Sequence, residues 1–257
     1  MREIETLAAV LAFAAVFLFG QRLAVTRKGW RRASVSAGAG AAVAYVFVDL
    51  LPDLEEAGRT FVQATAGQTW RVSWLAEPHV YLAALAGFVV FYGLEHLVAW
   101  SRRTTRTEEP GDSKERPVFL LHIGGFAVYA AMVSYLMVRG IGMAQASIAL
   151  YTVAMALHFL SVDHALLREH GPLYVRRGRY VLAGAALAGW AFGMLAEIPK
   201  PLLCTLLGLV SGGVIMNSTI MELPREKDGK FWAFLLGALA YAAIVLLAVG
   251  SGAGGEP

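Results

Sequence analysis

Long apolar stretches recur along the whole chain and are separated by short charged segments. About 20 consecutive apolar residues cross the hydrocarbon core of a bilayer as an α-helix. The sequence therefore predicts an all-α membrane protein in which residues 1–257 form one polytopic membrane domain. Eight transmembrane helices are predicted, at residues 4–25, 33–52, 78–100, 117–138, 146–167, 180–197, 201–222 and 231–250.

The composition agrees with a membrane protein and argues against other classes. Charged residues make up 16% of the chain, whereas soluble domains carry about 25%. The net charge of +3 is modest and no interleaved basic and aromatic surface is present, so nucleic acid is not an expected partner. Cys204 is the single cysteine. The chain therefore has neither an internal disulfide nor a cysteine-based metal cluster, and Cys204 is expected to be a small packing residue.

The basic residues alternate between successive loops. The loops after the first, third, fifth and seventh helices are rich in them, and the other loops are poor. Basic loops mark the cytoplasmic side, so both termini are predicted to lie outside. Residues 101–116 then form a charged cytoplasmic linker and residues 53–77 an external loop. The alternation favours eight helices; seven is the main alternative, because only the sequence IPKP separates the sixth helix from the seventh.

The second and seventh predicted helices resemble each other in sequence. Each has small residues early, an aliphatic run, and then an acid shortly before a proline. Gly40 precedes Pro52 by twelve residues, and Gly212 precedes Pro224 by twelve. The pattern fits an inverted repeat that relates helices 1–3 to helices 6–8 around a central pair, a 3+2+3 arrangement typical of transporters. Close packing of small residues is the alternative explanation.

Several polar residues lie inside the predicted helices or at their ends. They are Asp49, Glu95, His96, His122, His158, Asp163, His164, Asn217 and Glu222. Charged groups in a membrane interior are costly and therefore mark candidate sites. Imidazole and carboxylate groups are ligands for Zn²⁺ and similar metals. Asp163 and His164 are adjacent and point about 100° apart, so a complete site needs ligands from other helices.

Five of these residues also have a structural alternative. Asp49 and Glu222 precede prolines near helix ends and could cap the helix or lie at the interface. Glu95 could equally pair with an arginine that follows it. His158 lies deepest and could equally be a core histidine bonded to a carbonyl, while Asn217 could be a polar contact between helices.

Three stretches resemble the ZIP (Zrt/Irt-like) family of divalent metal transporters: YVFVDLLPDLEE, GFVVFYGLEHLV and SGGVIMNSTIMELP. The predicted eight spans, external termini and cytoplasmic linker also match that family. The resemblance implies a metal site between the fourth and fifth helices, where the family carries HNxxDG or HNxxEG and HExPHE. His122, His158 and Asp163 match ligand positions, whereas Ile123, Phe126, Phe159 and Val162 replace ligands.

The first hypothesis is a ZIP-like transporter of a divalent cation, zinc or a similar ion, with a reduced single site. The predicted ligands are His122, His158, Asp163, Asp49 and Asn217. The predicted entry and exit residues are Asp53, Glu95, His96, His164 and Glu222. The chain is expected to be a plasma-membrane, multi-pass protein with no enzymatic activity and no required cofactor. Its expected partners are the lipid bilayer and the transported cation, with a second copy of the chain as a candidate homodimer partner.

Two other hypotheses remain open. The replaced ligands favour a ZIP-fold protein that no longer transports metal and carries another solute or acts as a partner subunit. An intramembrane zinc hydrolase could use Ser161, Asp163 and several histidines. Such an enzyme needs about three ligands and an open water position.

Overall fold

Helices make up every regular element that the computed structural model contains in the residues it describes, which are 2–23, 28–66, 78–105, 112–140, 148–221 and 230–253. The α-helices are α1 (Arg2–Phe19), α2 (Lys28–Tyr45), α3 (Leu51–Thr65), α5 (His79–Thr105), α6 (Asp112–Arg139), α7 (Ile148–Leu173), α8 (Arg179–Leu195), α9 (Lys200–Met216) and α10 (Phe231–Ala253). The π-helical turns η2 (Val46–Leu50), η3 (Tyr174–Gly178) and η4 (Asn217–Met221) and the 3-10 turn η1 (Gly20–Leu23) adjoin them. The all-α prediction is confirmed for these ranges.

Five helical stretches within the described ranges are long and apolar enough to cross a membrane: Val35–Thr65, His79–Ser101, Pro117–Arg139, Ile148–Leu195 and Lys200–Ile220. Phe231–Leu247 is a shorter apolar helix. The stretch Ile148–Leu195 contains two of the predicted helices and bends at Gly171, whose φ of 50° and ψ of −126° suit a glycine. The count of eight spans stays a prediction.

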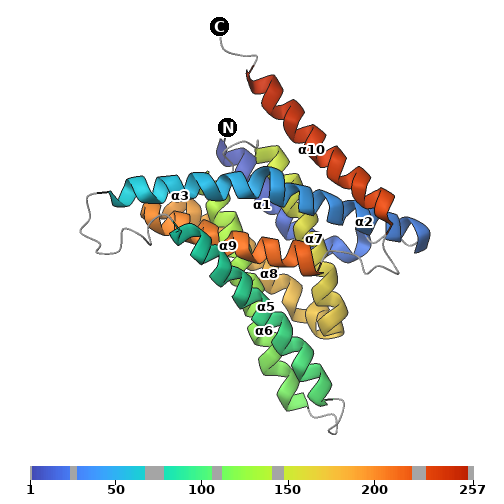
Figure 1. Ribbon diagram of the computed structural model, residues 1–257. Helices are drawn as coiled ribbons and strands as arrows, with labels where there is room; N and C mark the ends of the chain where they lie inside the picture. Colours follow the sequence, from blue (N-terminus) through green and yellow to red (C-terminus); the bar gives the residue numbers. More distant parts are fainter. Residues whose placement is uncertain are drawn as a thin grey trace.

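The helices pack mainly in pairs (Figure 1). Helix α10 lies along α2, α9 along α5, and α8 along α6, while α1 contacts both α7 and α8. In Figure 1, α2 and α3 form one long rod, and α5 and α6 run side by side to the lower end of the molecule. The buried apolar core gathers where α1, α6, α7 and α9 meet.

Glycines bring two of these helix pairs into backbone contact. A Cβ atom on Gly40 of α2 would lie 2.0 Å from the carbonyl oxygen of Phe234 on α10, and one on Gly212 of α9 would lie 1.9 Å from that of Ala84 on α5. Glycine is therefore the residue that permits both approaches, as in close helix packing generally. The two glycines that match in the sequence comparison thus have the same packing role.

The segment after residue 52 differs from its prediction as an external loop, because α3 is helical as far as Thr65. Pro52 has no backbone N–H and its ring crowds the carbonyl four residues earlier, which usually ends or bends a helix. Here the wide turn Val46–Leu50 lies immediately before it. A π-turn provides the extra room, so the rod continues through the proline.

Candidate metal-binding site

Four ionisable side chains from three helices form a cluster with His122 of α6 at its centre. The Nδ1 atom of His122 lies 2.8 Å from Nε2 of His170 at the end of α7, and its Nε2 atom lies 3.2 Å from Oε1 of Glu95 on α5. Glu169 Oε2 is 3.8 Å from His122 Nδ1. His122 is 1% exposed, Glu95 14% and Glu169 13% by side chain. We call these four residues the histidine–glutamate cluster.

The local sequence explains why these side chains converge. Helix α7 extends beyond residue 167 and includes Glu169 and His170 in its last turns, before the bend at Gly171 and Pro172. Aromatic rings then fix the imidazoles. Phe119 lies edge-on to His170 with ring centroids 5.1 Å apart, and Phe126 lies edge-on to His122 at 5.2 Å. His122 is therefore buried, and the other three residues are partly buried, beside apolar rings, which strengthen the electrostatic interactions of the cluster by excluding water.

The cluster has the ligand types of a transition-metal site. One ligand atom from each of His122, Glu169 and His170 lies within 4.8 Å of the other two. Tetrahedral zinc with Zn–N distances of about 2.0–2.1 Å places its ligand atoms about 3.3 Å apart. The imidazole nitrogens of His122 and His170 are at hydrogen-bond distance, 2.8 Å, so a bound ion requires them to separate by about 0.5 Å.

The predicted ligands His158 and Asp163 lie elsewhere, bonded to tyrosines. His158 Nε2 is 3.0 Å from the hydroxyl of Tyr129. The hydroxyl of Tyr174 donates to Asp163 Oδ1 at 2.5 Å, and Asp163 is fully buried. Among the described residues, only His122 of the three family-matched positions belongs to a group with metal-ligand spacing.

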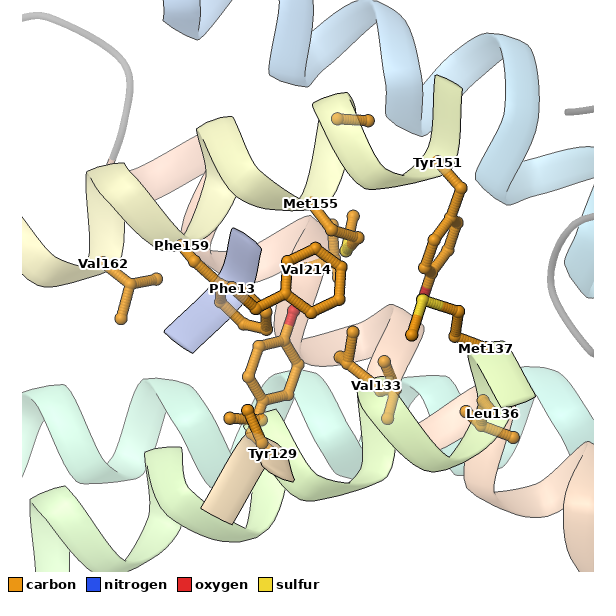
Figure 2. Packing of buried hydrophobic residues seen from close by; sticks show 14 of the residues in the cluster. Phe13, Tyr129, Val133, Leu136, Met137, Tyr151, Met155, Phe159, Val162 and Val214 are labelled. Carbon is orange, nitrogen blue, oxygen red and sulfur yellow. The ribbon is translucent and has the colours of Figure 1, made fainter. Parts of the chain in front are cut away.

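Aromatic and aliphatic side chains fill the space around His158 (Figure 2). Phe159 has no exposed surface, and its ring lies 5.2 Å from that of Phe13 and 6.1 Å from that of Tyr129. Figure 2 shows Phe159, Phe13, Tyr129 and Val214 meeting between the helices. The phenylalanine that replaces a family ligand therefore belongs to an apolar layer at this level of the bundle.

The other predicted site residues are dispersed. Asp49 is buried and its Oδ2 accepts a hydrogen bond of 2.7 Å from Tyr241 on α10, and Asp53 is also buried. Asn217 is buried where α9 passes into η4. His96 is exposed and stacks on Tyr92, and His164 is half-buried. Glu222 lies outside the described residues.

Sequence reasoning missed Glu169 and His170 as site residues. The predicted helix ended at residue 167, so both were assigned to a cytoplasmic loop. The charged residues from Arg168 onward predicted a solvent-exposed loop. Hydropathy does not show, however, that a helix continues through a charged segment before it bends. The available signal was a Glu-His pair directly before Gly171 and Pro172, which places both side chains in the last turn of a helix.

The comparisons with known proteins leave the family open. No protein-family model matches the chain. No curated protein and no solved structure is significantly similar to it. The fold and the site therefore define a class: a protein whose regular elements are all helices in its described residues, with several helices of membrane-spanning length and a partly buried cluster of histidines and glutamates.

Proposed function

We propose that this chain is a multi-pass plasma-membrane protein of ZIP-like fold that carries a divalent transition-metal cation, zinc or a similar ion, into the cell. The observation that carries the proposal is the approach of His122, Glu169 and His170, whose ligand atoms lie within 4.8 Å of one another. Two imidazoles with adjacent carboxylates are a ligand set suited to zinc. The site lies between α6 and α7, which correspond to the fourth and fifth predicted helices.

The charges of the cluster suit a transported dication. Glu95 and Glu169 supply two carboxylates beside the two imidazoles. In a low-dielectric interior, two negative charges compensate a divalent ion that has lost its water. The cation is then the substrate, bound strongly enough to enter and weakly enough to leave.

The helix pairing supports the 3+2+3 inverted repeat. Such a repeat exchanges α2 with α9 and α5 with α10, so a contact between α2 and α10 implies an equivalent contact between α9 and α5. Both pairs pack closely through glycine, at Gly40 in one and Gly212 in the other. In the proposed route the cation enters past Asp49 and Asp53 and leaves through the histidine–glutamate cluster. The proposed route also passes the apolar layer around Phe159, which would have to part during each cycle.

Metal uptake into proteoliposomes that contain a metal-sensitive dye tests the proposal. His170→Ala is expected to reduce uptake of zinc about tenfold or more, because it removes one of the few ligands. His79→Ala is the matched control, since His79 bonds to Thr205 and stacks on Phe61 away from the cluster. Equal uptake by His170→Ala and the unmodified protein would contradict the route.

A second candidate is a ZIP-fold protein that has lost metal transport. The observation that favours it is the burial of Phe126, Phe159 and Val162 at positions where the family carries ligands. Absence of uptake of zinc, manganese and iron by folded, unmodified protein in the same vesicles would select this candidate over the transporter.

A further inference from the structure

A small cavity lies beside the histidine–glutamate cluster. It is bounded by α5, α6, α7 and η4, and its polar lining comes from Glu95, Ser161 and Asn217, while the remaining lining is apolar. The space open to the centre of a water molecule is about 20 Å³. One water needs about 10–15 Å³ by this measure, so the cavity holds one water or one ion of similar size.

A buried amide lines this cavity, and its nitrogen has no hydrogen-bond partner among the residues that the structure describes. Asn217 is 2% exposed, and no hydrogen-bond partner for its Nδ2 atom is found in the described part of the chain. The neighbouring hydroxyl of Ser218 is likewise buried without a partner there. A buried polar group without a hydrogen-bond partner is destabilising, so the cavity is suited to a polar occupant. The oxygen and nitrogen of an amide exchange by rotation of the side chain, so Asn217 can present either to that occupant.

Glu95 connects the cavity to the cluster. Glu95 lines the cavity, and its Oε1 atom lies 3.2 Å from His122 Nε2. The oxygens of a carboxylate, an amide and a hydroxyl suit cations that prefer oxygen ligands, such as Mn²⁺, whereas the imidazoles of the cluster suit Zn²⁺ and Co²⁺. Two neighbouring sites of different ligand type thus share one carboxylate.

We propose that the cavity formed by Glu95, Ser161 and Asn217 is a second cation site with oxygen ligands, and that Glu95 is the shared ligand through which a cation passes between it and the histidine–glutamate cluster. This inference rests on the proposed function, since it concerns the same cation and the same route. It assigns a ligand on α5 and another at the start of η4, outside the helices that supply the two family-matched motifs.

Two probe metals separate the sites in the purified, full-length protein. Co²⁺ bound by imidazoles reports the cluster through its visible absorption, and bound Mn²⁺ reports the cavity through loss of its free-ion EPR signal. Asn217→Ala and Ser161→Ala are each expected to weaken Mn²⁺ binding about tenfold and to leave the Co²⁺ spectrum unchanged. His170→Ala is expected to do the reverse, and Glu95→Gln to weaken both.

Glu56→Gln is the matched control for Glu95→Gln, because Glu56 is exposed on α3. If Asn217→Ala does not fold, Ser161→Ala carries the test alone. The inference would be overturned if the unmodified protein does not bind Mn²⁺, or if Asn217→Ala and Ser161→Ala bind Mn²⁺ as tightly as the unmodified protein does. Absence of Co²⁺ binding with Mn²⁺ binding retained would instead refute the proposed transition-metal site and leave the oxygen site standing.

Discussion

Replacing Gly212 by alanine is expected to separate α9 from α5. The new Cβ atom would lie 1.9 Å from the carbonyl oxygen of Ala84 and 2.6 Å from the backbone nitrogen of Phe88. Ordinary van der Waals contact begins at 3.4 Å, so the contact with Ala84 is short by about 1.5 Å. Both obstructing atoms belong to a helix backbone, which no side-chain rotation can move. The helices must therefore shift apart along much of their shared length.

The magnitude follows from two opposing effects. Overpacking of a well-packed interior costs about 1–3 kcal/mol, and a clash with rigid backbone belongs at the upper end. Alanine gains about 1 kcal/mol over glycine in helix propensity. The net loss expected for Gly212→Ala is therefore about 2 kcal/mol. For a domain of this size, 1 kcal/mol shifts Tm by about 2–4 °C, so a fall of about 4–8 °C is expected.

Thermal unfolding in detergent, followed by circular dichroism, measures this change. Gly184→Ala is the matched control, because a Cβ atom there meets nothing within 4 Å. That variant gains helix propensity without a clash and is expected to raise Tm by about 2–4 °C. Equal Tm values for the two variants would refute the packing of α9 on α5 described here. Gly40→Ala, which meets Phe234 at 2.0 Å, is expected to behave as Gly212→Ala does.

Three further predictions concern side chains that bond to another segment of the chain. The Tyr135 hydroxyl accepts a hydrogen bond from the N–H of Ile198 and donates one to the carbonyl of Ala196. Tyr135→Phe should therefore lower the free energy of unfolding by about 1–2 kcal/mol in the same assay, and an unchanged Tm would contradict these two hydrogen bonds. Tyr174→Phe removes the donor to the fully buried Asp163 and should cost about 1–3 kcal/mol. Tyr180→Phe is the control, because the Tyr180 side chain is exposed and its hydroxyl accepts from the adjacent Arg179; equal stability of the two variants would show that the bond to Asp163 does not matter. A hydrogen bond from Arg139 holds the pKa of Glu197 below its ordinary value of 4.5. The stabilisation from this ion pair is therefore present above pH 4.5 and is lost as the pH falls through the lowered pKa. Glu197→Gln should remove that part of the pH dependence, and an unaltered profile would contradict the pairing.

The sequence was sufficient to predict the elements with the longest apolar runs. The predicted helices 78–100 and 117–138 correspond to α5 (His79–Thr105) and α6 (Asp112–Arg139). The matched spacing of Gly40 and Gly212 also identified two glycines that meet neighbouring backbones. Both signals are local, since hydropathy and residue size are properties of the segment itself.

The candidate site was only partly predictable, because its geometry depends on contacts between distant segments. His122 was singled out, but its neighbour His170 is 48 residues away and lies near it only because α7 continues beyond residue 167. His158 was also singled out, but its partner is Tyr129, a residue that no ligand motif contains. Burial and partners of a polar side chain are set by packing, which periodicity alone does not reveal.

The wide turn Val46–Leu50 can lose a residue without changing which side of α3 faces inward. Each residue advances an α-helix by about 100°, and a π-turn takes up one extra residue by advancing less at each step. Removing one residue from α3 itself, such as Asp53, would therefore rotate the rest of α3 and bring Glu55 and Arg59 to the positions that Leu54 and Gly58 now occupy. The exposed Glu55–Arg59 pair would then point into the protein. Removing one residue from Val46–Leu50 would instead convert the wide turn to an ordinary α-helical turn and keep the inward face of α3, so the same deletion should be far less damaging there.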